Sequence, residues 1–257
     1  MKTVLIKCGG STLEELSDEF FASLHELKKQ DYKLVVVHGG GPDINQMLDQ
    51  LDVEIEFNNG LRKTNLETFN VVEMVLSGQT NRKLVHKLTM NNLKAVGLNG
   101  SDAGLLKGDY VDKNGLGLVG DITEVNAEII HYFLQHDIIP VITPIAMGKD
   151  GVKLNVNADY AAAAVANALQ VEQCLFVTDV EGIMIDGKVK DTIPVLDIEA
   201  YIEKGEIYGG MIPKVVSAVS AIKKGIESVR IVAGKKSFFL NNEWYGTKIL
   251  GKERVIK

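Results

Sequence analysis

Runs of consecutive aliphatic residues recur along the chain, and the stretches between them are long enough to form helices. Such runs are typical of strands that are buried on both faces of a sheet. We predict strands at residues 4–6, 34–37, 94–98, 138–143, 174–177 and 229–232. Between the first two, apolar residues at helical spacing follow Ser17, a residue type that favours helix N-caps. Strands that alternate with helices indicate an α/β fold.

The first two predicted strands run directly into glycines. Residues 4–6 lead into Lys7-Cys8-Gly9-Gly10, and residues 34–37 lead into His38-Gly39-Gly40-Gly41-Pro42, where proline suits the first turn of a helix. In open α/β sheets, ligands bind at the carboxyl ends of the strands. Glycine lets backbone N–H groups approach a phosphate closely, and a lysine beside the loop supplies a positive charge. Two such elements favour an anion-binding site over ordinary strand-to-helix turns.

The next stretch combines a turn signal with a helix signal. Apolar and acidic residues alternate from Val53 to Phe57, and Asn59-Gly60 is typical of a hairpin turn. Thr64-Asn65-Leu66-Glu67 matches a capping box and predicts an amphipathic helix that ends near Gly78. A separate helix is then predicted through residues 84–88.

Two glycine-containing stretches match nucleotide-binding motifs in spacing, but their flanking residues do not fit those motifs. Residues 115–120 match GxGxxG, but polar residues precede them where a buried strand is required, and no helix begins at the third glycine. Residues 182–188 match GxxxxGK, but Val189 stands where a phosphate-binding loop needs a hydroxyl group for magnesium. We predict β-hairpins at both places, the second turning at Asp186-Gly187, and a further hairpin around Asn241-Asn242.

Two helix N-termini in the second half carry unusual polar residues. Asn155-Val156-Asn157-Ala158-Asp159 precedes an alanine-rich helix at 160–169; capping explains Asn157 and Asp159 but leaves Asn155 unexplained. Residues 209–214 open a long helix and place Lys214 in its first turn. Because the helix dipole disfavours a cation there, we predict an anion beside Lys214.

The amino-acid composition limits the classes of protein to which this chain could belong. A hydrophobic content of 46% with 24% charged residues is typical of a globular protein with a sizeable core. The net charge of −6, made up of −7 in residues 1–170 and +1 in residues 171–257, disfavours nucleic acid as a partner. Cys8 and Cys174 lack CxxC spacing and the histidines lack ligand spacing, so we expect free thiols and no protein metal site. Since no apolar run has membrane-spanning length and no leader precedes the first strand, we expect a cytoplasmic protein without membrane contact.

Taken together, the set of motifs resembles the amino-acid kinase family over almost the whole chain. The matching pieces are residues 6–10, 37–42, 59–62, 155–159, 178–182 and 210–214. Asn59-Gly60-Leu61-Arg62 and residues 155–159 are typical of the members that phosphorylate N-acetyl-L-glutamate. The resemblance implies a three-layer αβα sandwich around an open, mainly parallel sheet of about eight strands. It also implies two lobes, at residues 1–170 and 171–257.

The resemblance further implies a reaction. ATP with Mg²⁺, bound by the second lobe, would donate its γ-phosphoryl group to the side-chain carboxylate of N-acetyl-L-glutamate, bound by the first. The product would be N-acetyl-L-glutamyl 5-phosphate, in arginine biosynthesis, and no tightly held protein metal is implied. Such a carboxylate has a pKa of about 4.3 and is ionised at neutral pH, so no general base is needed. Positioning and electrostatic stabilisation would supply the catalysis.

By the same resemblance, the site residues fall into three groups. The transferring phosphoryl group would lie between Lys7 and Lys214, with Asp159 holding both lysines in place. The acidic substrate would be bound by Gly40, Gly41, Arg62, Asn155 and Asn157. Arg62 would grip a carboxylate in a bidentate fork, whereas capping alone would account for Asn157. The nucleotide would contact Gly9, Gly10, Thr178, Asp179, Gly182, Met184, Ile207, Tyr208 and Met211.

Oligomeric state is inferred from the start of the chain. Arginine-inhibited hexamers of the family carry an extra helix before the first strand, whereas here that strand begins near Thr3. We therefore expect a homodimer without arginine feedback, paired through the helix at residues 64–78 and its neighbours.

Two alternative functions stay open from the sequence. One is a kinase of the same fold that acts on acetylaminoadipate, aspartate, glutamate, carbamate or a nucleoside monophosphate, since one methylene changes discrimination by only about 1–3 kcal/mol. The other is a non-catalytic nucleotide-sensing module, although binding alone does not require both lysines and Asp159.

Overall fold

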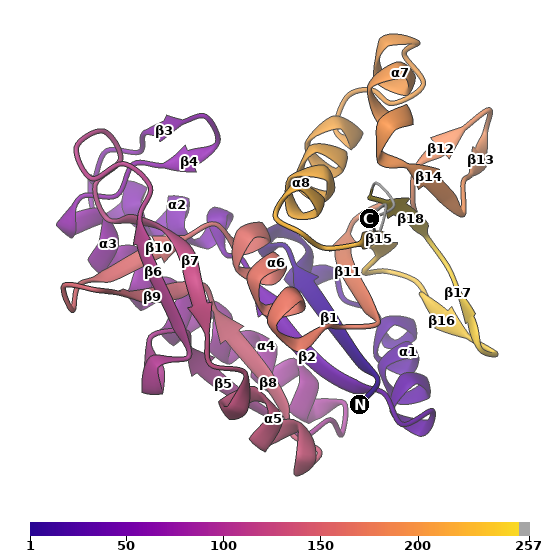
Figure 1. Cartoon of the computed structure of the whole chain (residues 1–257), viewed down its shortest axis with the longest axis horizontal. Coiled ribbons are helices and arrows are strands. Elements are labelled where there is room, and N and C mark those ends of the chain that lie inside the picture. Colours follow the sequence, from indigo (N-terminus) through magenta and orange to yellow (C-terminus); the bar gives the residue numbers. More distant parts are fainter. Residues whose placement is uncertain (252–257) are drawn as a thin grey trace, which may run out of the picture.

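An eight-stranded sheet forms the centre of the computed structural model, which describes residues 1–251 (Figure 1). Its strand order is β14-β18-β15-β11-β1-β2-β8-β5. In chain order the strands are β1 (Thr3–Cys8), β2 (Lys33–His38), β5 (Ala95–Asn99), β8 (Ile139–Thr143), β11 (Gln173–Thr178), β14 (Thr192–Pro194), β15 (Ser228–Ala233) and β18 (Thr247–Leu250). All neighbours pair in parallel except β15 and β18. The predicted mainly parallel sheet of about eight strands is confirmed.

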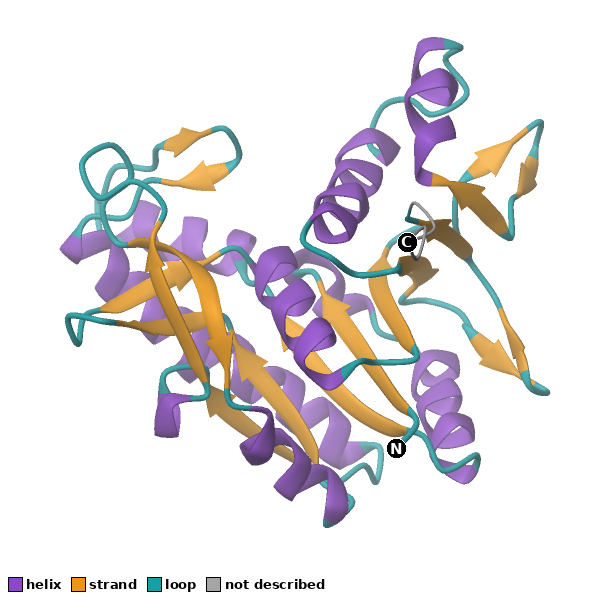
Figure 2. Ribbon diagram, viewed as in Figure 1, coloured by secondary structure: helices purple, strands orange, loops and turns teal. Residues whose placement is uncertain are grey.

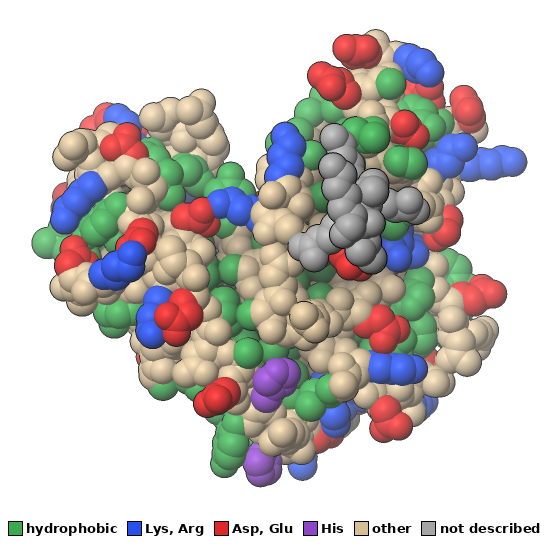
Figure 3. Space-filling view, viewed as in Figure 1, with side chains coloured by type: hydrophobic (Ala, Val, Ile, Leu, Met, Phe, Trp, Pro, Cys, Tyr) green, Lys and Arg blue, Asp and Glu red, His purple; other side chains and the backbone are tan. Residues whose placement is uncertain are grey.

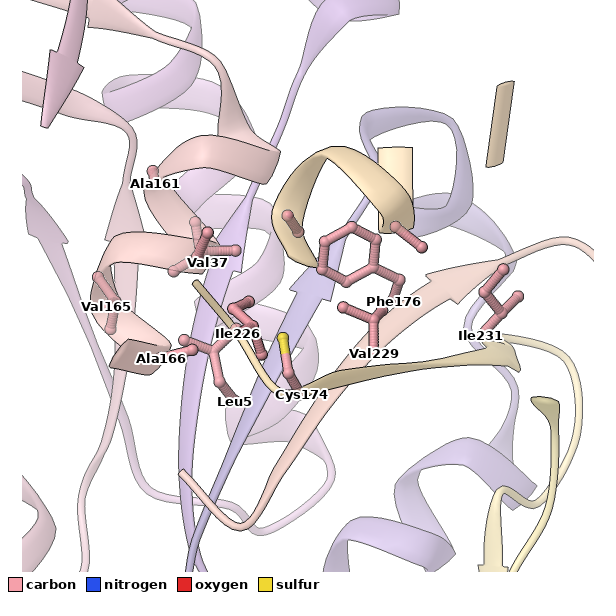
Figure 4. Close-up of a cluster of buried hydrophobic side chains, with 14 of the residues drawn as sticks. Leu5, Val37, Ala161, Val165, Ala166, Cys174, Phe176, Ile226, Val229 and Ile231 are labelled. Carbon is pink, nitrogen blue, oxygen red and sulfur yellow. The ribbon is translucent and has the colours of Figure 1, made fainter. Parts of the chain in front are cut away.

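Helices cover both faces of this sheet and complete the three layers. One face packs against α1 (Asp18–Lys29) and α4 (Asn81–Met90), and the other against α5 (Ala127–Gln135), α6 (Ala158–Leu169) and α8 (Met211–Lys223). Figure 4 shows Leu5 of the sheet next to Ala166 of α6, with Cys174 and Phe176 of β11 in the same cluster. Each such buried Leu or Phe side chain stabilises the fold by about 1.5–3 kcal/mol.

The alternation of side chains along β1 decides where Lys7 lies. Val4, Ile6 and Cys8 point into the cluster beneath α1 and α4, whereas Leu5 points into the cluster beneath α6 and α8. Because successive side chains of a strand point to opposite faces, Lys7 shares the face of Leu5. The strand therefore places its lysine beneath the N-terminal ends of α6 and α8.

A second, smaller sheet lies beside the main one and was not predicted. β6 (Leu106–Tyr110), β7 (Val119–Val125), β9 (Ile145–Gly148) and β10 (Lys153–Val156) close into a four-stranded barrel. β6 and β7 pair antiparallel around residues 111–118, which confirms the hairpin prediction for the GxGxxG match. No local sequence pattern predicts the barrel, because the strands that close it are distant in sequence.

The helical stretch after residue 65 differs from the prediction in two respects. The N-cap is Asn65, whose Oδ1 accepts a hydrogen bond from the Thr68 N–H at 2.8 Å, so the predicted capping box was placed one residue too early. The buried Thr64 hydroxyl instead donates to the Arg62 carbonyl at 2.8 Å. The helix also does not end near Gly78, since α3 (Leu66–Glu73) continues through a π-helical segment (Met74–Thr80) directly into α4. Burial of Val75, Leu76 and Thr80 holds this segment against the rest of the fold.

The remaining elements are short and lie outside the main sheet (Figure 2). They are α2 (Gly41–Gln50), α7 (Ile198–Glu203) and the hairpins β3 (Phe57–Asn58) with β4 (Leu61–Arg62), β12 (Met184–Ile185) with β13 (Lys188–Val189), and β16 (Phe239–Leu240) with β17 (Glu243–Trp244). The hairpins predicted at Asn59-Gly60, Asp186-Gly187 and Asn241-Asn242 are confirmed. None of the helices within residues 1–251 combines the length and apolar character that crossing a bilayer requires.

Candidate active site

The two glycine loops touch each other at the carboxyl edge of the sheet. β1 and β2 run in register, with Cys8 opposite His38, so Gly10 and Gly40 follow at the same level. A Cβ atom on Gly10 would lie 2.7 Å from the Gly40 Cα, and one on Gly40 would lie 2.6 Å from Leu76 Cδ2 of the π-helical segment. A side chain at Gly10 would force the two backbones apart, whereas one at Gly40 would require the Leu76 side chain to shift. The loops thus present backbone rather than side chains to the edge.

A buried histidine fixes the orientation of the second loop. His38 is fully buried, and burial lowers the pKa of its imidazole to about 4, so the ring is neutral near pH 7. Nε2 lies 3.1 Å from the Asn81 amide nitrogen, which donates to it, and Nδ1–H donates to the Gly39 carbonyl at 3.1 Å. The Gly39 carbonyl and the Gly40 N–H belong to one planar peptide and point in opposite directions. No acceptor within residues 1–251 takes the Gly40 N–H, which is available to an anion.

Lys7 is held by Asp159 at the start of α6. The Lys7 ammonium lies 2.8 Å from Asp159 Oδ1 and 5.2 Å from the centre of the Phe176 ring, and both charged side chains are mostly shielded from solvent. Asp159 is in the first turn of α6, which Asn157 caps by accepting from the N–H groups of Asp159 and Tyr160 at 2.8 and 3.3 Å. The cap therefore fixes the carboxylate that orients Lys7.

Lys214 has the anion that its place in the first turn of α8 predicts. Its ammonium lies 3.1 Å from Asp179 Oδ1 and donates to the Gly210 carbonyl at 2.8 Å. Burial alone would raise the pKa of Asp179, but Lys214 outweighs it and holds this pKa below the usual 3.8. Asp159 does not contact Lys214, contrary to expectation; its Oδ2 accepts from Ser217 one turn along α8, at 2.5 Å. Asp159 thus pairs with Lys7 and connects only indirectly to the helix of Lys214.

A cavity of about 180 Å³ opens beside the glycine loops. Its lining includes all five residues expected to bind the acidic substrate, namely Gly40, Gly41, Arg62, Asn155 and Asn157. They come from α2, β4, β10 and the N-terminus of α6. Asn157 thus both caps a helix and faces the cavity. At larger scale the molecule is hollowed between the part that carries β3 and β4 and the part that carries α7 and α8 (Figure 3).

Arg62 is a buried cation without a carboxylate partner. Its side chain lies 4.6 Å above the Phe57 ring, and Nη2 donates to Asn45 Oδ1. No Asp or Glu within residues 1–251 forms an ion pair with it, and its Nη1 is buried without a hydrogen-bond partner. Burial lowers the pKa of the guanidinium, although arginine stays charged in proteins. A charged group that is buried next to a cavity and lacks a counter-ion favours an anionic ligand in that cavity.

Most of the residues expected to contact the nucleotide lie after β11 or around the start of α8. Thr178 ends β11, and its hydroxyl bonds with the backbone of Val180. Met184 and Tyr208 are 56% and 73% exposed, whereas Ile207 is buried. Gly182 has φ +155°, and a Cβ there would lie 2.6 Å from the Thr247 hydroxyl, so this turn requires glycine. Of the other members, Asp179 follows β11 and Met211 is the first residue of α8, whereas Gly9 and Gly10 follow β1.

Several residues of the site were missed by sequence reasoning. Asn45 and Phe57 position Arg62, and His38 with Asn81 positions the second glycine loop. These contacts join residues that share no sequence motif, so nothing in the sequence indicated them. Ser217 could have been selected from the sequence, because residues three apart on a helix share a face and Ser217 lies three positions after Lys214. Among residues 1–251, no cluster of three or more His, Cys, Asp and Glu side chains is arranged to hold a metal.

Comparison with known proteins agrees with this geometry. Residues 2–233 match the sequence model of the Amino acid kinase family. The acetylglutamate kinase of Bacillus velezensis is 48% identical over 256 residues, and that of Bacillus subtilis is 46% identical over 255; each alignment covers 99% of both chains. Among solved structures, smu.665 from Streptococcus mutans UA159 has a TM-score of 0.81 at 32% identity, covering 96% of this chain and 98% of that one. Giardia carbamate kinase, with a TM-score of 0.64 at 17% identity over 97% and 99% of the two chains, shares the fold. The chain belongs to the amino acid kinase family.

Proposed function

We propose that this chain transfers the γ-phosphoryl group of ATP to the side-chain carboxylate of N-acetyl-L-glutamate, in arginine biosynthesis. Curated relatives that span almost the whole chain at 46–48% identity are acetylglutamate kinases. The structural observation that carries the proposal is Arg62, a buried guanidinium with one unpartnered nitrogen beside the cavity. A substrate carboxylate would supply the missing counter-ion in a bidentate pair.

Each group of site residues has its own role in the proposed reaction. Arg62, Asn155 and Asn157 hold the acid, and the backbone N–H groups of Gly10, Gly40 and Gly41 face the phosphoryl group. Lys7 and Lys214 neutralise the charge that develops on the phosphoryl oxygens from two sides, and Asp159 orients Lys7. The attacking carboxylate is already ionised near pH 7, so catalysis consists of positioning and charge stabilisation.

The nucleotide is assigned to residues 171–257 and the acid to residues 1–170. We expect ATP to contact Thr178, Asp179, Gly182, Met184, Ile207, Tyr208 and Met211 of this part, together with Gly9 of the first glycine loop. Mg²⁺ would enter as part of the MgATP substrate, since magnesium is commonly held by phosphate oxygens and water. Both cysteines are free, and ATP is the co-substrate, which together fit work in the cytoplasm.

The substrate assignment is tested by measuring ADP release with a panel of acceptors. We expect kcat/KM for N-acetyl-L-glutamate to exceed that for N-acetyl-L-aminoadipate by about 10-fold or more, the usual effect of one methylene in a fitted pocket. Aspartate, glutamate, carbamate and nucleoside monophosphates should be poorer still. Turnover of another acceptor without turnover of N-acetyl-L-glutamate would refute the assignment, and ATP binding without any turnover would favour the sensing module.

We also propose a homodimer that pairs through α3 and the π-helical segment. Leu66, Asn70, Met74 and Gly78, spaced four apart, are all exposed along this helix, and Leu66 and Met74 are 68% and 52% accessible. A stripe with two large apolar side chains at this spacing is typical of a helix that packs against a partner.

The proposed dimer predicts a mass of twice 28.1 kDa in sedimentation velocity. Met74→Glu would bury a charge in the interface and should shift the protein to monomers. Met90→Glu is the matched control, because Met90 is also exposed, at 68%, but ends α4 and lies outside the stripe. A hexamer, a wild-type monomer, or a dimer that survives Met74→Glu would contradict the proposed interface.

A further inference from the structure

Ser217 makes a contact that the assigned reaction does not yet use. Its hydroxyl donates to Asp159 Oδ2 at 2.5 Å, across the junction between α8 and α6. Asp159 Oδ1 faces the Lys7 ammonium on its other side. We propose that Ser217 is a positioning residue, which sets α8, and with it Lys214, relative to Asp159 and Lys7. The proposal rests on the phosphoryl-transfer function above.

Few residues connect Lys7 to the helix that carries Lys214. Lys7 belongs to β1, Asp159 to the first turn of α6, and Ser217 to α8. Lys214 lies one helical turn before Ser217, and side chains three apart on a helix have Cβ atoms about 5–6 Å apart. Direct contact between Asp159 and Lys214 is absent from the described part of the chain, where Lys214 pairs with Asp179. The serine hydroxyl is therefore the link from Asp159 to the helix that carries Lys214.

The nature of this contact makes it suited to fixing a distance. A hydroxyl that donates to a carboxylate forms a short, charge-assisted hydrogen bond, and 2.5 Å lies at the short end of that range. Asp159 is itself fixed by the Asn157 cap of α6, so the bond joins α8 to an already rigid point. Lys7 and Lys214 must reach the same phosphoryl group, and small errors in such positioning are costly to rate. Loss of the link should therefore lower kcat rather than weaken substrate binding.

Steady-state kinetics of three variants test this role. We expect Ser217→Ala to lower kcat about 5- to 20-fold while KM for N-acetyl-L-glutamate and for MgATP changes less than about 2-fold, the split expected of an interaction that acts in the transition state. Ser217→Thr keeps the hydroxyl and should restore most of kcat. Ser220→Ala, one turn further along α8 and without a side-chain bond to Asp159, should match the wild type.

A measurement that does not depend on turnover tests the hydrogen bond between Ser217 and Asp159 directly. In thermal unfolding, Ser217→Ala and Asp159→Ala should be non-additive when combined, because each removes the same bond. Additive effects would overturn the proposal, as would a kcat for Ser217→Ala equal to that of Ser220→Ala, or failure of Ser217→Thr to recover activity. If the wild-type chain phosphorylates no acceptor, the proposed function fails, whereas an active wild type with an unaffected Ser217→Ala variant overturns only the positioning role.

Discussion

Replacing Lys214 with alanine is expected to lower kcat by about 10²–10³-fold, the usual cost of removing one preorganised group that stabilises transition-state charge. Lys214 lies at the N-terminus of α8, where its only anionic partner among residues 1–251 is Asp179, 55% of whose side chain is exposed. That exposed pair contributes little to folding. The loss should therefore appear in catalysis, with KM for both substrates nearly unchanged.

Initial rates of ADP formation with N-acetyl-L-glutamate and MgATP measure this effect. Lys223→Ala is the matched control, because it removes an exposed lysine from the last turn of the same helix, away from the glycine loops. A Lys214→Ala variant with normal kcat and a raised KM for ATP would show that the lysine only binds the nucleotide. Equal losses in both control and test variants would point to damage to α8 as a whole.

Replacing Arg62 with alanine should raise KM for N-acetyl-L-glutamate by about 10- to 100-fold, because a hydrogen-bonded charge contributes about 1.5–3 kcal/mol. The guanidinium lines the small cavity with one nitrogen unpartnered, so its removal should affect the acid rather than ATP. The proposed ATP site lies on other elements, so KM for MgATP should stay within about 2-fold of the wild-type value.

Two comparisons sharpen the Arg62 result. Arg62→Lys keeps the charge but loses the planar fork, so it should recover only part of the affinity. Lys63→Ala removes the neighbouring exposed lysine, which pairs with Glu56, and should leave KM for the acid unchanged. An Arg62→Ala variant with wild-type KM for N-acetyl-L-glutamate would remove the carboxylate clamp from the proposed function.

The two predicted effects should separate because the residues come from different elements: Arg62 from β4, Lys7 from β1 and Lys214 from α8. Gly40 lines the cavity that is proposed to bind the acid. Gly10 approaches Gly40 closely, so the first glycine loop lies next to the second. Lys7 and Asp159 lie on the face of the sheet covered by α6 and α8. Replacement of Arg62 is thus not expected to move Lys7 or Lys214.

The sequence by itself determined the features that local physics controls. Buried strands follow from aliphatic runs, and the turn at Asp186-Gly187 follows from residues that accept positive φ, with values of 51° and 72°. The anion beside Lys214 was predicted from the helix dipole, and Asp179 supplies it. Motifs that resemble the amino-acid kinase family selected Arg62, Asn155 and Asn157, which the fold gathers around one cavity.

Only the tertiary structure decided which side chains meet. The partnership of Arg62 with Asn45, the bond from Ser217 to Asp159 and the barrel closed by β6, β7, β9 and β10 join segments that are far apart in sequence. The passage of α3 through a π-helical segment into α4 likewise depends on burial of Leu76 and Thr80, which overrides the tendency of Gly78 to end a helix. Local propensity cannot specify such contacts, because their free energy exists only once packing has brought the partners together.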